Sequence, residues 1–485
     1  MAQLAPVAGK QPARNASATS IPVFNPATGE QIGQVADGGP RAVDEAVARA
    51  RDSFRSGSWR RMLPKQRARV MWRVAEIIER RAEEIVELEA RNNGMSRVLA
   101  RNLVATAAEL FRYNAGWCTK IHGQSSDLLV EGGISGANAE YHGYTLKEPA
   151  GVAGLIVPWN GRFMGAAQKL APALAAGCSC VLKPAEETPL TTLLLPSILQ
   201  EAGVPDGVVN LVTGYGESTG AALSAHPDVD KIAFTGSTET GKHIVRAAAG
   251  NLKKVTLELG GKSPVLIYND ADLSKAIPGA AMGIFINSGQ GCVCGSRIYA
   301  QRGIYEPLVE GIARIAKSLK LGGCDDPGAD IGPIISERQL ERVMGFLDDG
   351  RKDGAHVVTG GRRLDRPGYF VEPAVITQVR PQMRLMREEI FGPVVAIVPF
   401  DDDEQAIAEA NDTDYGLAAA IWTRDIGRAH RVAKRVEAGT VWLNCQLAWD
   451  AAMPFGGYKQ SGWGYEYGWE GVNTYLKTKS VYTEL

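Results

Sequence analysis

Two cysteines, Cys292 and Cys294, lie in a glycine-rich turn that reads INSGQGCVCGSR over residues 286–297. Four kinds of site fit such a pair. They are a metal centre, a disulfide, two small buried residues, and a nucleophile that bonds covalently to a substrate. The residues elsewhere in the chain have to decide among these four interpretations.

The metal and disulfide interpretations find little support in the rest of the sequence. A metal centre needs several converging ligands, but the six histidines are scattered and no second cysteine pair stands at ligand spacing. We therefore predict no metal. A disulfide between Cys292 and Cys294 would be strained, so we expect it only as an inactivating product of oxidation. The seven cysteines are sparse and odd in number, which favours reduced thiols and a cytoplasmic location.

Two further polar residues stand next to apolar strand-like runs. Glu258 lies between Leu257 and Leu259, and a carboxylate there is costly to bury unless it does chemistry or is paired. Asn160 follows the run GVAGLIVPW, where its amide could serve chemistry or simply cap a turn.

Glycine-rich turns also offer places for a nucleotide. The segments at 214–220 and 289–295 read G-x-G-x-x-x-G, one residue longer than the dinucleotide fingerprint, so each is weak evidence. FTGSTETGKHI, starting at Phe234, places Ser237 where a strand gives way to a helix. Backbone N–H groups there could hold a pyrophosphate, or Ser237 could only cap the helix. LKPAEET supplies Lys183 and Glu186, either for ribose hydroxyls or as part of a solvated loop.

The elements that must position these residues alternate between apolar strands and helices. Residues 41–122 have the apolar spacing of helices, and from 151 onward short apolar runs are separated by helices of ten or more residues. A second alternating set covers about 263–459. Such alternation predicts parallel sheets, so we expect an α/β fold with two Rossmann-like domains. The last run, LKTKSVYTEL, resembles an edge strand that another element or subunit covers.

Composition excludes several classes of partner. The net charge of −1 offers no electrostatic footprint for nucleic acid or for anionic membranes. No window approaches the roughly 20 apolar residues of a membrane span. The first twenty residues lack the apolar core of a signal peptide and are typical of a flexible tail.

Ten motifs, in order and over nearly the whole chain, resemble those of the aldehyde dehydrogenase superfamily. They are NPATGE at 25, GVAGLIVPWN at 151, LKPAEETP at 182, FTGSTETG at 234, LELGGKSP at 257, GQGCVCGSR at 289, EEIFGPV at 388, NDTDYGLAAAIWT at 411, GTVWLN at 439 and PFGGYKQSG at 454. The resemblance favours the fourth interpretation of the cysteine turn. It implies that Cys292 is the nucleophile and that Cys294 is a packing residue.

The resemblance also implies a mechanism. Cys292 would add to an aldehyde, and Asn160 would stabilise the oxyanion. Hydride would pass to NAD, with NADP as a second possibility, and Glu258 would activate the water that hydrolyses the thioester. The cofactor would lie against Trp159, Lys183, Glu186, Gly216, Phe234, Gly236, Ser237, Glu389 and Phe391. Glu186 favours NAD because a carboxylate repels a 2′-phosphate.

The chain departs from its relatives around the predicted substrate tunnel. Gly161 replaces an aromatic residue, Gly165 stands at a usually bulky position, Gln168 stands where tryptophan is common, and Gly291 is small before the nucleophile. We therefore predict a wide pocket for a bulky or aromatic aldehyde. The predicted pocket residues are Gly161, Arg162, Gly165, Gln168, Gly291, Val293, Trp449 and Phe455.

Arg162 allows an alternative substrate class. It could anchor an anionic tail, which would make the chain a semialdehyde dehydrogenase, or it could be a solvated residue at a helix start. Two further alternatives are a thiol esterase that uses Cys292, and a structural or binding relative without turnover. An aldehyde assay that follows NADH separates these readings.

The resemblance further implies a domain plan and a homodimer or homotetramer. We expect a flexible tail at 1–20, an NAD-binding domain at 21–126 and 150–260, a catalytic domain at 261–470, and a small β oligomerisation segment at 127–149 and 471–485. Lys254, Tyr465 and Lys477 stand where several relatives carry an arginine–glutamate–arginine set that links subunits. We therefore expect different interface contacts here.

Overall fold

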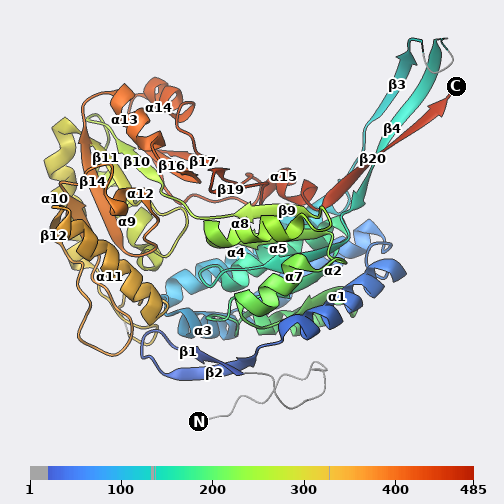
Figure 1. The fold of residues 1–485 in the computed structure, drawn as a ribbon, viewed down its shortest axis with the longest axis horizontal. Helices are drawn as coiled ribbons and strands as arrows, with labels where there is room; N and C mark the ends of the chain where they lie inside the picture. Colours follow the sequence, from blue (N-terminus) through green and yellow to red (C-terminus); the bar gives the residue numbers. More distant parts are fainter. Residues whose placement is uncertain (1–19, 133–135, 137, 327) are drawn as a thin grey trace.

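The computed structural model describes residues 20–132, 136, 138–326 and 328–485. The predicted flexible tail lies outside the described residues, except for Ser20, which begins a strand. Within the described ranges the predicted α/β class is confirmed, because the chain builds two sheets of mostly parallel strands with helices on both faces (Figure 1).

The first sheet has six strands in the order β19-β9-β8-β5-β6-β7, and all but β19 run parallel. Its strands are β5 (Val152–Ile156), β6 (Ser179–Lys183), β7 (Val209–Leu211), β8 (Lys231–Thr235), β9 (Lys254–Glu258) and β19 (Gly462–Trp463). β5 and β6 are buried along their whole length, as their continuous apolar runs require. Alternate side chains therefore enter different cores, so that Leu155 packs on one face and Val152 on the other.

The helices of this unit divide between the two faces. α2, α4, α5 and α6 pack in one core, and α1 and α8 in the other. The helices are α1 (Gly39–Ser56), α2 (Pro64–Arg80), α3 (Ala82–Asn93), α4 (Arg97–Trp117), α5 (Arg162–Ala176), α6 (Leu195–Ala202), α7 (Ala221–Ala225) and α8 (Thr238–Ala248). A β-hairpin of β1 (Ser20–Phe24) and β2 (Gln31–Ala36) precedes them.

The second sheet has seven strands in the order β12-β13-β14-β11-β10-β16-β17, and only β12 is antiparallel to its neighbour. Its strands are β10 (Pro264–Ile267), β11 (Arg297–Gln301), β12 (His356–Thr359), β13 (Ala374–Thr377), β14 (Val394–Phe400), β16 (Ala418–Trp422) and β17 (Thr440–Leu443). Its helices are α9 (Leu273–Phe285), α10 (Tyr305–Ser318), α11 (Glu337–Lys352), α12 (Arg384–Arg387), α13 (Asp403–Asn411) and α14 (Ile426–Ala433). Helices α9 and α10 share one core, and α13 and α14 share another.

The C-terminal segment returns from the second unit to the first. After the short pair β15 (Tyr415–Gly416) and β18 (Tyr458–Lys459), β19 joins the edge of β9, and α15 (Gly468–Asn473) follows. The domain boundary at 470 stays a prediction, but the chain already contributes to the first sheet at Gly462. β19 has only two residues, one of them glycine, so no strand pattern marks it in the sequence.

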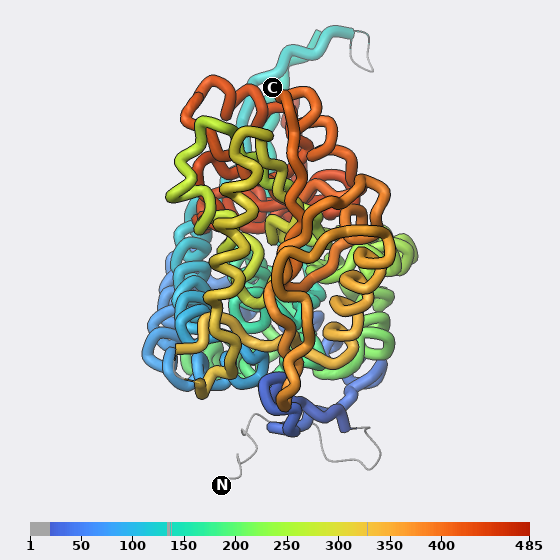
Figure 2. The backbone as a smooth tube through the Cα atoms, turned by 90° about the vertical axis from the view of Figure 1, so that its left-hand side faces the viewer, coloured from blue at the N-terminus to red at the C-terminus, as the bar shows by residue number. Residues whose placement is uncertain are grey.

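A three-stranded antiparallel sheet projects from the body at the end opposite the β1–β2 hairpin (Figures 1 and 2). It consists of β3 (Ser125–Val130), β4 (Ala139–Pro149) and β20 (Leu476–Glu484), and we call it the arm. The predicted terminal edge strand is β20, which pairs with β4 along its whole length. Leu129, Tyr144, Leu146 and Tyr482 expose large apolar side chains on the arm. Among the described residues, no helix is long and apolar enough to span a membrane.

Candidate active site

A rigid turn between α9 and β11 carries the two cysteines. Asn287 and Ser288 have positive φ angles of 49° and 55°, so the chain leaves the helix in a left-handed bend. Gln290, which is 1% exposed, anchors this bend. Its Nε2 donates to the carbonyls of Asn287 and Pro333, and its Oε1 accepts from the Ile335 N–H at 2.8 Å. The turn therefore holds the cysteines in a fixed position.

Cys292 and Cys294 differ in access. Cys292 is partly exposed and borders the apolar core that contains the buried Val293, Cys294 and Phe455. Burial raises the pKa of the Cys292 thiol, and the nearby charges of Glu389 and Glu258 raise it further. All seven cysteines are free, and no cluster of metal-ligating side chains is present in the described part of the chain. Of the two sulfurs, the one at 292 is the one a substrate can reach.

Glu258 closes β9 and is only 2% exposed. Neither of its carboxylate oxygens has a hydrogen-bond partner among the described residues. Burial raises the pKa of this carboxyl well above its usual value, and the charge of Glu466 adds to the rise, while Lys169 opposes it. The loop that follows β9 contacts the cysteine turn, because a Cβ on Gly261 would lie 2.3 Å from the carbonyl oxygen of Cys292. A buried carboxyl with a raised pKa suits a general base near neutral pH.

A buried polar cluster behind Glu258 was not predicted from the sequence. Glu466 accepts hydrogen bonds from the Lys169 ammonium and from the Gln168 amide, one on each carboxylate oxygen. Lys169 also donates to Thr235 Oγ1 at 2.8 Å. A lone lysine in the apolar stretch of α5 was the available signal, because a buried ammonium requires a partner.

Asn160 stands at the carboxyl end of β5, beside the cysteine turn. Its Nδ2 donates to the carbonyl of Gln290 at 3.1 Å, which fixes the amide two residues before the nucleophile. Its role in stabilising an oxyanion stays a prediction. An amide nitrogen carries two N–H bonds, so a second donor remains for an oxygen that develops at Cys292.

Arg162 is not the solvated residue that one interpretation predicted, and its burial does not support the anionic-tail interpretation. Arg162 does begin α5, but its side chain is 1% exposed and its Nε donates to Glu89 Oε1 at 2.9 Å. Its Nη1 donates to the carbonyls of Trp159 and Asn160. A guanidinium that is buried and paired has no charge to offer a substrate. The semialdehyde hypothesis therefore loses the residue on which it rested.

The residues predicted for the adenosine end of a cofactor cluster where β6 ends. Lys183 Nζ lies 3.2 Å from Glu186 Oε2, and the backbone N–H of Gly216 donates to Glu186 Oε1 at 3.3 Å. Ser237 caps α8, because its Oγ accepts from the Thr240 N–H. Gly236 must be glycine, since a Cβ would lie 2.4 Å from the ring of Phe234.

The residues predicted for the nicotinamide end lie nearer the cysteine turn. The rings of Trp159 and Phe391 meet edge to face at 5.2 Å. Glu389 Oε1 accepts from the Gly261 N–H at 2.9 Å, and burial raises the pKa of Glu389 to about 7. Gly261 therefore contacts both this carboxylate and Cys292, which brings the predicted ribose-binding residue next to the predicted nucleophile.

Two glycines of the predicted substrate pocket have free space around an added Cβ, and a third has a close neighbour. A Cβ on Gly165 would meet no neighbouring atom within 4 Å, and one on Gly161 would make only ordinary contact with Pro158 at 3.8 Å. By contrast, a Cβ on Gly291 would press on Cys294 Sγ at 3.0 Å. A larger residue at 291 would therefore require Cys294 to shift, which gives this glycine a packing role, and its contribution to a wide pocket stays a prediction.

Three aromatic residues form one wall beside these positions. Trp449 lies 4.9 Å from Phe455 and 6.3 Å from Tyr467, measured between ring centroids, and is 46% exposed. Tyr467, which was not predicted, has a positive φ of 60°. Tyr467 and Cys292 both pack against the core that contains Phe455, which places the tyrosine near the predicted nucleophile. Trp449, Phe455 and Tyr467 are called the aromatic wall below.

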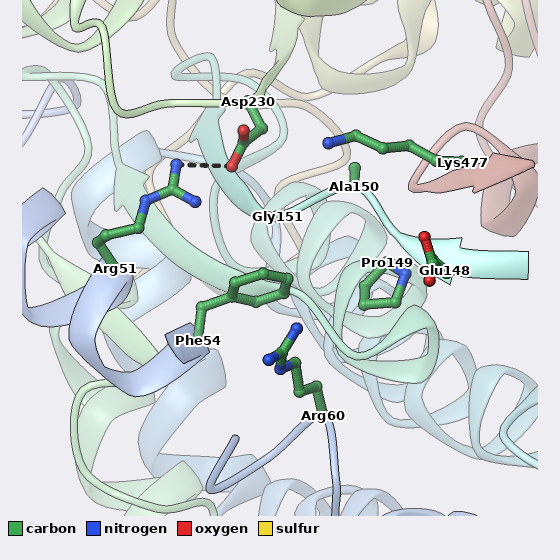
Figure 3. A pocket seen from close by; sticks show the side chains of 9 residues that line it. All are labelled: Arg51, Phe54, Arg60, Glu148, Pro149, Ala150, Gly151, Asp230 and Lys477. Carbon is green, nitrogen blue, oxygen red and sulfur yellow. Dashed lines mark hydrogen bonds and ion pairs between the residues drawn. The ribbon is translucent and has the colours of Figure 1, made fainter. Parts of the chain in front are cut away.

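A separate hollow of about 290 Å³ lies at the root of the arm (Figure 3). It contains none of the predicted site residues. Arg51 pairs there with Asp230 at 2.7 Å, and the guanidinium of Arg60 stacks on Phe54 at 4.7 Å. Lys477 enters from β20.

Comparisons with known proteins agree with this geometry. Residues 13–481 match the aldehyde dehydrogenase family. The chain is 44% identical to aldehyde dehydrogenase family 2 member C4 of Arabidopsis thaliana, over 96% of this chain and 92% of that one. The NAD⁺ complex of an aldehyde dehydrogenase from Bacillus cereus superposes with a TM-score of 0.93 at 44% identity, covering 96% of this chain and 94% of that one. An NAD⁺ complex of betaine aldehyde dehydrogenase from Staphylococcus aureus gives 0.92 at 38% identity, covering 96% and 92%.

These matches span nearly the whole chain at high identity. The chain therefore belongs to the aldehyde dehydrogenase family. The resemblance drawn from its ten motifs is confirmed.

Proposed function

We propose that this chain oxidises bulky, in particular aromatic, aldehydes to carboxylic acids with NAD⁺ as the cofactor. Its family and its NAD⁺-bound relatives support the reaction class. The open space at Gly161 and Gly165, next to the aromatic wall, is the observation that supports a bulky substrate.

Each step has a residue in a suitable place. The Cys292 thiol gives its proton to water, and the thiolate sulfur adds to the aldehyde carbon. The amide of Asn160 with the backbone N–H of Cys292 holds the oxygen that becomes negative. Bound NAD⁺ supplies the acceptor for the hydride that leaves this carbon. The acyl group then rests on Cys292 as a thioester. Glu258 takes a proton from the water that hydrolyses it.

The residues fit NAD⁺ by their chemistry. At one end, the Lys183–Glu186 pair stands at the carboxyl end of a parallel strand, where nucleotides bind in such folds. At the other end, the Glu389 carboxylate and the Trp159 and Phe391 rings lie near the cysteine turn. A carboxylate such as Glu186 accepts hydrogen bonds from both ribose hydroxyls and repels a 2′-phosphate, so NADP⁺ should be the weaker cofactor.

The helix face of α5 that lies toward the aromatic wall carries small residues, which favours a wide pocket. Gly161, Gly165 and Gln168 share this face, because residues three and four apart lie one above the other on a helix. Two of the three positions carry no side chain. A flat ring between this face and the aromatic wall would bury apolar surface that a two-carbon aldehyde cannot.

The test compares kcat/KM for acetaldehyde and for cinnamaldehyde, each with NAD⁺ and with NADP⁺. We expect cinnamaldehyde with NAD⁺ to be the best combination. An equal or higher kcat/KM for acetaldehyde would reject the bulky-substrate proposal while leaving the reaction class intact.

We further propose that the arm joins subunits of a homodimer or homotetramer. Its exposed apolar side chains and the free edge of β20 favour a covering partner. At its root, burial lowers the pKa of Lys254, and the charges of Lys477 and Lys147 lower it further. The two carboxylates that line the hollow, Asp230 and Glu148, pair with Arg51 and Lys479, so we expect a second subunit to supply further acidic groups for Lys477 and Arg60.

A further inference from the structure

Gln168 lies on the face of α5 that borders the proposed substrate pocket. It is partly buried and follows Met164 by one turn. The sulfur of Met164 is in contact with the hydroxyl of Tyr467, at 3.8 Å. Gln168 therefore stands beside the aromatic wall, at the position one turn beyond the open site of Gly165.

The hydrogen bond to Glu466 fixes the orientation of the Gln168 amide. Its Nε2 donates to Glu466 Oε2, and the other oxygen of that carboxylate accepts the Lys169 ammonium. A flipped amide would set an oxygen against a carboxylate oxygen, with two acceptors and no proton between them. The contact with Glu466 therefore keeps Gln168 Oε1 turned away from this carboxylate.

This amide oxygen is left without a donor. Nothing among the described residues donates a hydrogen bond to Gln168 Oε1, and the atom is not buried. The polar groups of the aromatic wall are the hydroxyl of Tyr467, which contacts Met164, and the indole N–H of Trp449, which can only donate. An apolar substrate that covers this oxygen displaces the water bound to it and offers no hydrogen bond in exchange, which lowers the affinity. A substrate with a hydroxyl at this place restores the hydrogen bond.

We infer that Gln168 is a specificity-determining residue that accepts a hydrogen bond from a hydroxyl on the body of the substrate. This inference rests on the proposed function. Within bulky aldehydes it selects hydroxylated ones, such as hydroxyaryl aldehydes, over analogues of equal size without a donor. The discrimination comes from an oxygen that the Glu466 carboxylate has oriented before the substrate arrives.

The test uses pairs of substrates that differ only in the donor. Meta- and para-hydroxycinnamaldehyde are compared with the methyl-substituted analogues in the wild type and in Gln168→Met, which keeps the length and removes the acceptor. For each protein, kcat/KM for the hydroxy substrate is divided by kcat/KM for the methyl substrate. The two ratios are then compared between wild type and variant, so that electronic effects of the substituents cancel. We expect the ratio to fall by about five- to tenfold in Gln168→Met for at least one ring position.

Tyr467→Phe is the matched control, because it removes the hydroxyl that could also accept a hydrogen bond in the aromatic wall. We expect it to leave the ratio unchanged. A ratio that collapses in Tyr467→Phe and not in Gln168→Met would assign the contact to the tyrosine and overturn the inference.

A binding measurement keeps the inference testable if Gln168→Met folds poorly. Hydroxy- and methyl-substituted cinnamyl alcohols are not aldehydes, so they can be compared as competitive inhibitors of the wild type. We expect the hydroxy compound to bind about fivefold more tightly. Equal inhibition for both ring positions would overturn the inference. If cinnamaldehydes are oxidised no better than acetaldehyde, the proposed function fails instead.

Discussion

Arg162 and Glu89 form an ion pair with a 2.9 Å contact in which both side chains are 1% exposed. The pair connects α3 with the first turn of α5. Arg162 Nη1 also donates hydrogen bonds to the carbonyls of Trp159 and Asn160, in the loop that leads into α5. Its position indicates a structural role in holding this loop.

Replacing Arg162 by methionine should destabilise the protein by about 3–5 kcal/mol, because it leaves the Glu89 carboxylate buried and unpaired. Urea unfolding monitored by circular dichroism measures this loss. The double variant with Glu89→Leu should recover much of it, since neither charge then remains. A wild-type unfolding curve together with a raised KM only for carboxylated aldehydes would instead return Arg162 to the substrate site.

Glu258→Gln should separate the two halves of the reaction. Glutamine cannot take a proton from water, so steady-state turnover should fall by about 10²–10⁴-fold. The rapid burst of NADH that accompanies acylation of Cys292 should persist, because that half precedes the hydrolysis. Stopped-flow absorbance shows both phases. A burst lost together with turnover would mean that Glu258 acts earlier than proposed.

The affinity for NAD⁺ should depend on pH through Glu389. Because burial raises the pKa of this carboxyl to about 7, it is mostly protonated below pH 7 and ionised above it. The ionised form accepts stronger hydrogen bonds from ribose hydroxyls, so the Kd for NAD⁺ should fall by about five- to tenfold as the pH rises from 6 to 8. Tryptophan fluorescence quenching gives the Kd without turnover. Glu389→Gln should flatten the curve, whereas Glu258→Gln should keep it.

Gly165→Leu should narrow the pocket at little cost in stability. No neighbouring atom lies within 4 Å of the added Cβ, and leucine favours a helix over glycine by about 0.8–1 kcal/mol. We expect kcat/KM for cinnamaldehyde to fall at least about tenfold, as one lost ring contact allows, with acetaldehyde little changed. Gly345→Leu on α11 is the control, because its Cβ also has free space but lies in another unit. If Gly165→Leu lowered kcat/KM for the two aldehydes equally, or for neither, the proposed route of the substrate would be contradicted.

Leu146→Glu on the arm should weaken assembly. Leu146 is exposed on β4, and a buried, unpaired carboxylate at a subunit contact is costly. Light scattering after size-exclusion chromatography should show a smaller species or one that dissociates on dilution. Leu63→Glu, at another exposed leucine outside the arm, should leave the mass unchanged. An unaltered mass in both variants would remove the arm from the interface.

The strands, and the position of Cys292 in a glycine-rich turn, could be predicted because their signals are local, whereas the role of Cys292 was implied only by the resemblance of ten motifs over nearly the whole chain. Apolar runs such as β5 and β6 must be buried on both faces, and the carboxyl ends of parallel strands bring Asn160, Glu258 and the Lys183–Glu186 pair to the side of the sheet where ligands bind. The motif around Cys292 lies within a dozen residues. These features depend on neighbours in the chain.

The residues that escaped prediction depend on partners far away. Lys169 and Glu466 are paired although almost the whole second unit lies between them in the sequence. Glu89 pairs with Arg162 from a different helix. A single sequence shows that a buried charge needs a partner but does not name it. The contact between Gly291 and Cys294 was also not predicted, although the two residues are only three positions apart, because the sequence does not show how the turn is bent.

The order of the segments has a consequence for biosynthesis. β19, Glu466 and Tyr467 come from the end of the chain, yet they complete the first sheet, the cluster behind Glu258 and the aromatic wall. A nascent chain thus contains Cys292 well before it contains the residues that complete the aromatic wall and the cluster behind Glu258. We therefore expect a polypeptide that ends before β19 to leave the proposed site incomplete and to oxidise no aldehyde.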